Sequence, residues 1–407
     1  MVEAVTVEER NVLKSVAVLT FSAGFVAQFF AQGVSLFLRD AGVASNVIGL
    51  IYLAAIPYTL RFVWAPLIDR SSLGGRGRFD RWILVSNAAL CLLLVVLAVL
   101  KPSEQALLII LVVGAAMLVL GTLQTALGGL LVEGLSATLY PRGASLQAAT
   151  SAAAGMVLGG CVLYLIGPLG WGPVVWALFT VCLAITVLAA LALTLDHNAT
   201  ASRGKQPRLW DQFSVFKDAR ARRLLLVSVS VSAAVVIPYA SKSVLLIDAG
   251  FSISDSGLIG IVAGNAAGFC GALLVRPLIE RKGGYFALTL LAGLNVTVVI
   301  CLILSLGTEP GAAAIVTLVL FANFSVFAAY TAGRSVLMPL CSPGQQATQL
   351  ASFVGVEAVL YLIIAGAGVS SLDKVGLIPL LSVGAGLSLV GCLLASRARD
   401  RPTVVAS

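Results

Sequence analysis

The stretch PYTLRFVWAPLIDRSSLGGRGRFDR, residues 57–81, decides the fold of this chain. It begins as an apolar helical segment that contains one cation, Arg61, and this segment ends in Pro66-Leu67-Ile68-Asp69-Arg70. A turn rich in glycine and arginine follows. A related run, Arg276-Pro277-Leu278-Ile279-Glu280-Arg281-Lys282-Gly283-Gly284, occurs in the second half of the chain. Two apolar helices that end in the same pattern indicate an internal repeat.

The composition of the whole chain excludes an ordinary soluble protein. Hydrophobic residues make up 59% of the 407 residues and charged residues only 11%, whereas soluble domains average about 45–50% and about 25%. A membrane-spanning helix needs about 20 mainly apolar residues and satisfies its own backbone hydrogen bonds. We therefore expect an all-α polytopic membrane protein with about 12 transmembrane helices in two six-helix bundles.

The lengths of the apolar runs predict where these helices lie. The expected spans are 13–38, 46–68, 82–100, 106–134, 144–166, 172–195, 223–247, 255–279, 284–306, 312–338, 347–369 and 375–396. This division predicts an N-terminal bundle over 1–195, a cytoplasmic linker over 196–222 and a C-terminal bundle over 223–407.

Two further motifs recur in the same order and in matching places. Asp40-Ala41-Gly42 precedes the second predicted helix, and Asp248-Ala249-Gly250 precedes the eighth. Pro141-Arg142-Gly143-Ala144-Ser145-Leu146-Gln147 has a weaker counterpart that begins at Pro343. Repeats of this kind are typical of transporters that alternate access around a site near the middle of the membrane.

The loops give the expected orientation and exclude several other functions. Lys and Arg collect after helices two, eight and twelve and in the central linker, which places both termini and this linker in the cytoplasm. We expect the membrane to be a bacterial inner membrane. These loops account for the net charge of +8, so we expect contact with the lipid bilayer and none with nucleic acid. The cysteines lie apart in apolar runs, and His197 is the only histidine. We therefore expect no metal site. We also expect no cofactor, no enzymatic activity and a monomer.

Ionisable residues inside a membrane helix are costly and are functional candidates by default. Lys242 and Arg334 are candidate substrate-binding cations, although Lys242 is near enough to a helix end to reach the interface instead. Glu357 lies near the middle of its helix, a depth that suits a group that takes up and releases a proton. Glu133 is a second candidate for proton coupling. It also matches Arg334 in depth, so the two either form a gate or are static packing ions.

Uncharged polar residues on the predicted helices complete the expected substrate lining. They are Gln28, Gln32, Gln124, Asn323 and Tyr330. The alternative for these residues is interhelical hydrogen bonding, which contributes about 0.6 kcal/mol each. Gly260, Gly264 and Gly268 recur every four residues and predict a close helix contact.

The motifs together resemble a known family. The acid, Arg and glycine/arginine turn after helix two, repeated after helix eight, resemble the loop motif of the major facilitator superfamily, although Ala65 stands where that motif begins with Gly. The run 57–70 is similar to the muropeptide permease branch. Val132-Glu133-Gly134-Leu135-Ser136 and the run 141–147 are most similar to ferric-siderophore permeases of the rhizobactin and pyochelin type.

The resemblance implies import of a ferric siderophore, driven by the proton-motive force, through a cavity between helices one, four, seven and ten. A permease for muropeptides or other amphiphilic solutes and a drug or siderophore exporter remain as alternatives. It also implies that the repeated loops form a gate, for which the candidates are Arg61, Asp69, Arg70, Arg76, Glu280 and Arg281.

Overall fold

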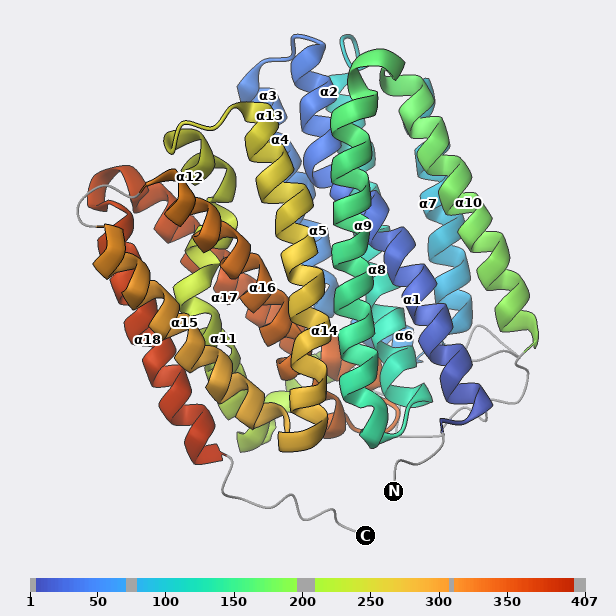
Figure 1. Ribbon diagram of the computed structural model, residues 1–407. Coiled ribbons are helices and arrows are strands. Elements are labelled where there is room, and N and C mark those ends of the chain that lie inside the picture. Colours follow the sequence, from blue (N-terminus) through green and yellow to red (C-terminus); the bar gives the residue numbers. More distant parts are fainter. Residues whose placement is uncertain (1–4, 71–78, 196–208, 307–310, 399–407) are drawn as a thin grey trace. The chain divides into compact units, whose positions relative to one another are not determined.

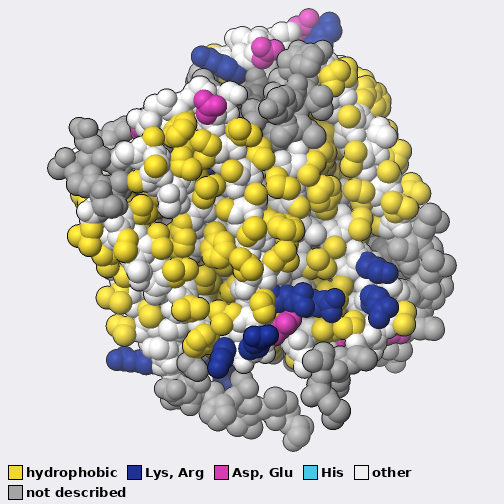
Figure 2. Space-filling view, in the orientation of Figure 1, with side chains coloured by type: hydrophobic (Ala, Val, Ile, Leu, Met, Phe, Trp, Pro, Cys, Tyr) yellow, Lys and Arg dark blue, Asp and Glu magenta, His cyan; other side chains and the backbone are white. Residues whose placement is uncertain are grey.

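The computed structural model is helical throughout the residues that it describes, which are 5–70, 79–195, 209–306 and 311–398 (Figure 1). Within these ranges no strand occurs, and ten helices are long and apolar enough to cross a membrane. Figure 2 shows hydrophobic side chains across the middle of one face, with Lys and Arg side chains towards its ends. The predicted fold class, an all-α polytopic membrane protein, is confirmed.

Apart from the segment 46–68, the helices of the first half lie close to the predicted spans. They are α1 (Val7–Gln28), the π-helical turn η1 (Phe29–Gly33), α2 (Val34–Asp40), α3 (Ser45–Ile48), α4 (Leu50–Ala54), α5 (Ile56–Thr59), the 3-10 turn η2 (Leu60–Val63), α6 (Ala65–Arg70), α7 (Asp80–Val99), α8 (Ala106–Gly134), η3 (Ala137–Leu139), α9 (Tyr140–Leu169) and α10 (Trp171–Leu195).

The second half contains a similar series of helices. They are η4 (Leu209–Lys217), α11 (Ala219–Ala240), α12 (Lys242–Asp248), α13 (Ile253–Gly257), the π-helical turn η5 (Leu258–Ala263), α14 (Gly264–Lys282), α15 (Gly284–Leu306), α16 (Ala312–Leu337), η6 (Met338–Leu340), α17 (Gln346–Val375) and α18 (Leu377–Ala398).

The prediction of one continuous helix over 46–68 is wrong, because this segment is divided into α3 to α6 and η2. Pro57 and Pro66 each lack a backbone N–H, and each ring crowds the carbonyl group four residues earlier. After the second break the chain restarts with a tighter turn, in which the Leu67 N–H donates to the Trp64 carbonyl oxygen at 2.9 Å. Pro238 has a similar effect near the end of α11, so that Lys242 begins a separate helix.

The first helix begins six residues before the predicted start because Thr6 caps it. The Thr6 side chain accepts a hydrogen bond from the Glu9 backbone N–H, and the Glu9 carboxylate accepts one from the Thr6 N–H, which is a capping box. The same carboxylate accepts from the Ser136 N–H at 3.1 Å. This contact attaches the start of α1 to the residues that follow α8.

The repeated Asp-Ala-Gly tripeptides form the same turn in both halves of the chain. Gly42 ends α2 with φ +78°, and Gly250 ends α12 with φ +89°. In each case the residue after the glycine donates a backbone hydrogen bond five residues back, from Val43 to Leu38 and from Phe251 to Leu246. This is the Schellman pattern, and glycine occupies its left-handed position without strain. The two halves therefore share local structure as well as sequence.

Contacts divide the chain into two compact units. Unit 1 comprises Met1–Ser136, Ala153–Val215 and Cys341–Gly355, and unit 2 comprises Ala137–Ala152, Phe216–Leu340 and Val356–Ser407. The boundary passes through α9 and α17, so each half of the sequence contributes a segment to the unit formed mainly by the other half. Within unit 2, α11, α15, α16 and α18 lie side by side (Figure 1).

The glycine series of the eighth predicted helix brings α14 against α16 in unit 2. A Cβ atom at Gly264 would lie 3.1 Å from the Asn323 side chain, and one at Gly268 would lie 2.6 Å from the Phe327 ring. A Cβ atom at Gly260 would instead lie 3.7 Å from the Lys242 side chain. The predicted close contact is confirmed for Gly264 and Gly268, because larger residues there would separate the two helices.

Candidate substrate and proton site

Arg334 lies in the last turns of α16 and is 5% exposed. Its guanidinium carbon is 4.3 Å from the centre of the Tyr330 ring, which lies one turn earlier on the same helix. Its Nε atom has no hydrogen-bond partner. A buried charged donor without a partner costs free energy, so this arrangement suits a residue whose partner is an anion from outside the chain.

Glu357 lies on α17, and Ser228 links it to the segment of α16 that carries Arg334, because a Cβ atom at Gly333 would lie 3.4 Å from Ser228 Oγ. The Ser228 hydroxyl on α11 donates a hydrogen bond to Glu357 Oε1. The Tyr361 hydroxyl lies 3.0 Å from the Ser228 carbonyl oxygen and 3.3 Å from Glu357 Oε1. Because a hydroxyl has one hydrogen to donate, Tyr361 can donate to the charged carboxylate or, once Glu357 is protonated, to the carbonyl oxygen.

Two more predicted lining residues of unit 2 lie farther from Arg334. Asn323 is 1% exposed, and its Oδ1 atom has no hydrogen-bond partner. Asn323 and Arg334 lie on the same face of α16, because the eleven positions from one to the other make about three turns. This spacing separates the two residues by about 16 Å along the helix axis. Lys242 lies near Gly260, with its Nζ 5.0 Å from the centre of the Tyr239 ring. These residues therefore do not form one compact cluster.

Unit 1 contains one further cation in a broken helix. Arg61 lies in η2 with its guanidinium carbon 4.7 Å from the centre of the Tyr58 ring, and its Nη1 atom has no hydrogen-bond partner. The break is held in place by Trp64, whose indole N–H donates to Thr122 Oγ1 at 3.0 Å. A Cβ atom at Gly121 of α8 would lie 3.2 Å from Arg61 Cβ, so α8 packs closely here.

The remaining candidates of unit 1 lie at separate places on its helices. Gln28 is the last residue of α1, and Gln32 lies in η1, where its side chain is outside the described residues. Gln124 and Glu133 are partly buried on α8, and both make polar interactions. The proton-coupling role of Glu133 stays a prediction.

Asp69 is the gate candidate with the most extensive contacts. It is 3% exposed, and its two carboxylate oxygens accept hydrogen bonds from the backbone N–H groups of Ala347 (3.3 Å) and Thr348 (2.7 Å). These groups belong to the first turn of α17, where the helix dipole favours a negative charge. Asp69 therefore fixes the start of α17 within unit 1.

Its counterpart in the repeat makes a different contact. The Glu280 side chain is 38% exposed and accepts a hydrogen bond from Arg276 Nε at 2.7 Å, one turn earlier on α14. Arg70 and Arg281 are exposed, and Arg76 lies outside the described residues. Within the described part of the chain, the two repeated motifs thus differ. The acid of the first motif, Asp69, contacts α17, whereas the acid of the second, Glu280, pairs with a residue of its own helix.

This difference gives a matched pair of variants. Asp69→Ala removes two charge-assisted hydrogen bonds from buried N–H groups and is expected to lower the free energy of unfolding by about 3 kcal/mol. Glu280→Ala removes an exposed ion pair and is expected to lower it by less than about 0.5 kcal/mol. Thermal unfolding in detergent, followed by tryptophan fluorescence, measures both changes. Equal shifts for the two variants would contradict the assigned contacts.

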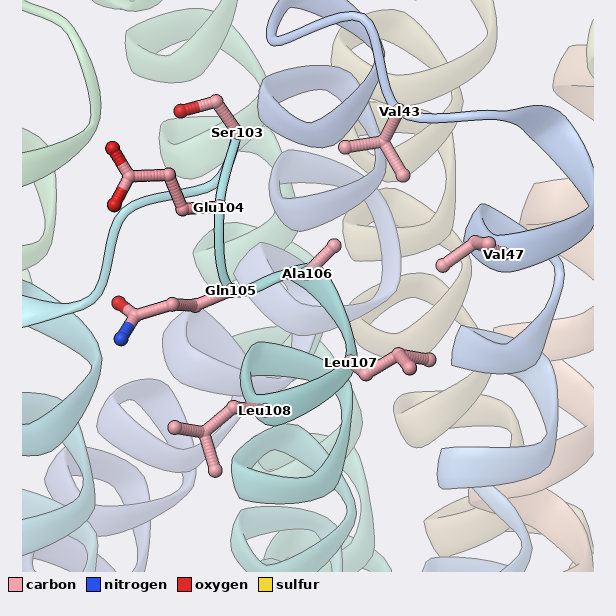
Figure 3. A pocket seen from close by; sticks show the side chains of 8 residues that line it. All are labelled: Val43, Val47, Ser103, Glu104, Gln105, Ala106, Leu107 and Leu108. Carbon is pink, nitrogen blue, oxygen red and sulfur yellow. The ribbon is translucent and has the colours of Figure 1, made fainter.

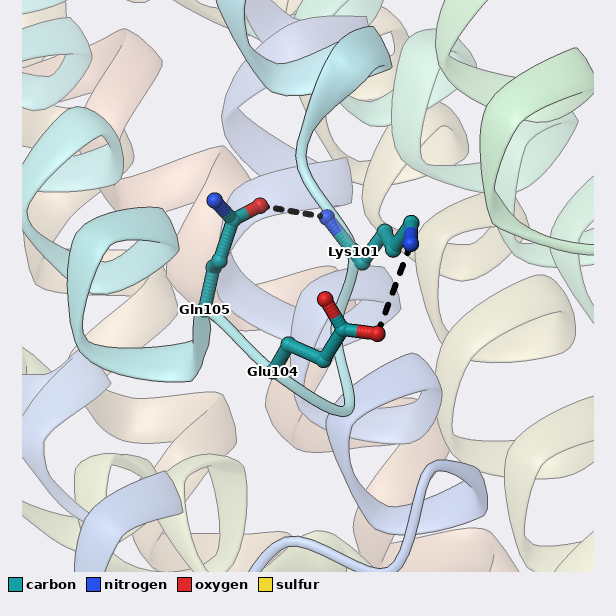
Figure 4. A network of polar contacts seen from close by, with 3 residues as sticks. All are labelled: Lys101, Glu104 and Gln105. Atoms are coloured by element: carbon teal, nitrogen blue, oxygen red, sulfur yellow. Dashed lines mark hydrogen bonds and ion pairs between the residues drawn. The ribbon is translucent and has the colours of Figure 1, made fainter.

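A surface hollow of about 500 Å³ lies where α8 begins (Figure 3). Val43, Val47 and the run from Ser103 to Leu108 line it. Next to it, Lys101 Nζ pairs with Glu104 at 3.4 Å and the Lys101 N–H donates to Gln105 Oε1 at 3.0 Å (Figure 4). Both members of the ion pair are about two-thirds exposed, so water screens them. The charged side chain that lines this hollow is the acid Glu104, so the hollow does not suit an anionic ligand.

The structure adds residues that the sequence reasoning missed. Ser228, which binds the Glu357 carboxylate, comes from tertiary contact and has no local signal, whereas Tyr361 lies one turn after Glu357 on the same helix. Tyr58 and Tyr239 were missed as well, whereas Tyr330 was a predicted lining residue, and all three have a local signal. Tyr58, Tyr239 and Tyr330 precede Arg61, Lys242 and Arg334 by three or four residues, the spacing at which helical neighbours meet. Each ring stabilises a cation through its face and leaves N–H groups available.

A polytopic helical fold with an internal repeat and with arginine nitrogen atoms that are buried without a hydrogen-bond partner is the architecture of a membrane transporter. A family model described as the Major Facilitator Superfamily matches residues 16–365. The chain therefore belongs to the Major Facilitator Superfamily, whose members bind small-molecule substrates in a membrane.

Individual relatives are distant. The chain is 24% identical to the anhydromuropeptide permease of Escherichia coli over 352 residues, which are 84% of this chain and 70% of the permease. It is 27% identical to an uncharacterised protein of Haemophilus influenzae over 191 residues, which are 46% of this chain and only 44% of that protein. The structure of a bacterial homologue of the iron transporter ferroportin, in an outward-facing state, matches this chain with a TM-score of 0.72 at 15% identity. The match covers 97% of this chain and 100% of that homologue. At that identity the likeness shows the fold alone.

Proposed function

We propose that this chain is a proton-driven secondary transporter that imports an anionic solute across a bacterial inner membrane. The observation that carries the proposal is Arg334, a buried cation with a donor that has no partner, next to a residue that contacts Ser228, the hydrogen-bond donor to Glu357. An anion would satisfy Arg334, and Glu357 would carry the proton. In this proposal both termini and the linker 196–222 are cytoplasmic, the bundles are 1–195 and 223–407, and the protein acts as a monomer.

The first substrate to test is a cell-wall muropeptide, which carries carboxylate groups. The similarity to the anhydromuropeptide permease of Escherichia coli extends over 84% of this chain and supports this choice. A ferric siderophore is the second candidate, supported by the runs 132–136 and 141–147 in the sequence. A ferric siderophore with carboxylate or catecholate ligands is also anionic, so the same cation would serve either one.

The gate is part of the same proposal. Arg61, Asp69 and Arg70 would act on the unit 1 side, and Glu280 and Arg281 on the unit 2 side. The contact of Asp69 with the first turn of α17 supports this role. Release of that contact would free the start of α17 when the cytoplasmic side opens.

Uptake into proteoliposomes tests the proposal directly. Purified protein is expected to accumulate a radiolabelled anhydromuropeptide when the outside is more acidic than the inside, and an uncoupler should abolish the accumulation. A labelled ferric siderophore serves as the parallel substrate. Accumulation of the siderophore alone would restore the siderophore assignment, and release of preloaded substrate against its gradient would indicate an exporter. No movement of either substrate would contradict the proposed function.

A further inference from the structure

The first part of α9 is fastened to two helices of unit 2. Ser145 Oγ donates a hydrogen bond to the Ala272 carbonyl oxygen of α14 at 2.7 Å. Ala148 and Ala149 pack against Ala272, with Phe269, Phe327 and Tyr330 around them. All of these residues belong to unit 2, although α9 precedes the central linker in the sequence.

One residue of this segment reaches the candidate anion site indirectly. Gln147 is 3% exposed, and its Oε1 accepts a hydrogen bond from the Tyr330 hydroxyl at 3.2 Å. The Tyr330 ring in turn lies 4.3 Å from the Arg334 guanidinium carbon. A continuous chain of contacts therefore runs from α9 through Tyr330 to the cation.

We infer that Gln147 is a positioning residue that couples anion binding at Arg334 to the docking of α9 on α14 and α16. The inference rests on the proposed function, which assigns the anion to Arg334. The hydrogen bond to Gln147 fixes the Tyr330 hydroxyl, and a cation–π contact depends on where the ring face lies. While α9 is docked, Tyr330 is held under Arg334 and the guanidinium is set for the anion. When α9 leaves, Tyr330 loses this partner, and the anion is released more easily.

Coupling between two sites is reciprocal, so the inference can be tested without any substrate. A single cysteine at position 149 (A149C), in a chain whose seven natural cysteines are replaced, reports on docking through its rate of labelling by N-ethylmaleimide in membranes. Labelling should be slow in the parent. R334Q and Y330F should each raise its rate by about fivefold or more, and the double variant should not exceed the faster single variant, because both act through one contact.

A matched control separates this effect from general unfolding. A cysteine at the exposed position 142 (R142C), on the same helix, should react with N-ethylmaleimide at the same rate in the parent, in both single variants and in the double variant. If Tyr330 had only a structural role, Y330F would alter the rate at position 149 and R334Q would not. A rate within twofold of the parent in R334Q would therefore overturn the inference.

Transport kinetics give the second readout. Q147L is expected to raise the KM for a radiolabelled anhydromuropeptide about tenfold, as for one lost hydrogen bond, with the maximal rate nearly unchanged. Thr150→Ala is the control on α9, because its hydroxyl bonds only to its own helix, at the Leu146 and Gln147 carbonyl oxygens. An unchanged KM in Q147L would count against the inference. If the unaltered protein carries neither substrate, the proposed function fails, and cysteine labelling still decides the coupling.

Discussion

Replacing Arg334 by glutamine is expected to abolish uptake of the anionic substrate at a normal level of protein in the membrane. The substitution removes the charge that a substrate anion would meet in a buried site, where losing one member of a charged pair costs about 2–5 kcal/mol. That range corresponds to a fall in affinity of roughly thirtyfold to several thousandfold. Initial rates in proteoliposomes, measured over a range of substrate concentrations, give the change.

Arg334→Lys is the matched variant for this experiment. It keeps the charge but loses the planar group that lies over Tyr330, so partial activity is expected. Arg142→Gln removes an exposed cation of the same unit and should leave uptake unchanged. Uptake by Arg334→Gln at the rate of the unaltered protein would remove this residue from the substrate site.

Replacing Glu357 by glutamine is expected to separate uptake from the proton gradient. The amide still accepts a hydrogen bond from Ser228, but it cannot gain or lose a proton. In the unaltered protein a charged Glu357 offsets Arg334 and weakens anion binding, whereas a protonated Glu357 leaves the cation available. Proton and anion therefore favour each other's binding, and affinity should fall as the pH rises. The variant resembles the protonated form, so its affinity should be high and should not change with pH.

Two measurements distinguish this outcome from simple loss of activity. Glu357→Gln should still exchange labelled for unlabelled substrate across the membrane, but it should not accumulate substrate when an acid-outside gradient is imposed. Glu133→Gln, at the other predicted proton-coupling acid, is the comparison. Retained accumulation in Glu357→Gln with loss in Glu133→Gln would transfer the coupling role to Glu133.

The fold was largely predictable because each span needs a long apolar run, and run length can be read directly from the sequence. The errors have local causes. The segment 46–68 reads as one apolar helix, yet Pro57 and Pro66 divide it. The first helix starts at Val7 rather than at residue 13, and Thr6 with Glu9 three residues later was a readable capping signal.

The candidate site was predictable in part. Ionisable residues are rare inside membrane helices, so the positions of Arg334 and Glu357 within their predicted helices were enough to identify both as candidates. Two of their neighbours do not stand out in this way, because Ser228 and Gln147 become important only when α11 and α9 pack against the site. Tyr361 lies one turn after Glu357 on α17, a spacing that the sequence does show. Gln147 was visible in the sequence only as the last residue of a repeated motif. Its contact with Tyr330 spans 183 positions, which no periodicity in one helix reveals.

The path of α9 and α17 across the unit boundary has a consequence for how this protein is put together. The segment 137–152, from the first half of the chain, belongs to unit 2, and the segment 341–355, from the second half, belongs to unit 1. The arrangement is comparable to domain swapping, in which two identical protomers exchange an element, except that here both partners lie on one polypeptide. Neither half on its own holds all the residues of its unit, so the two halves of the internal repeat are mutually dependent parts of a single protein.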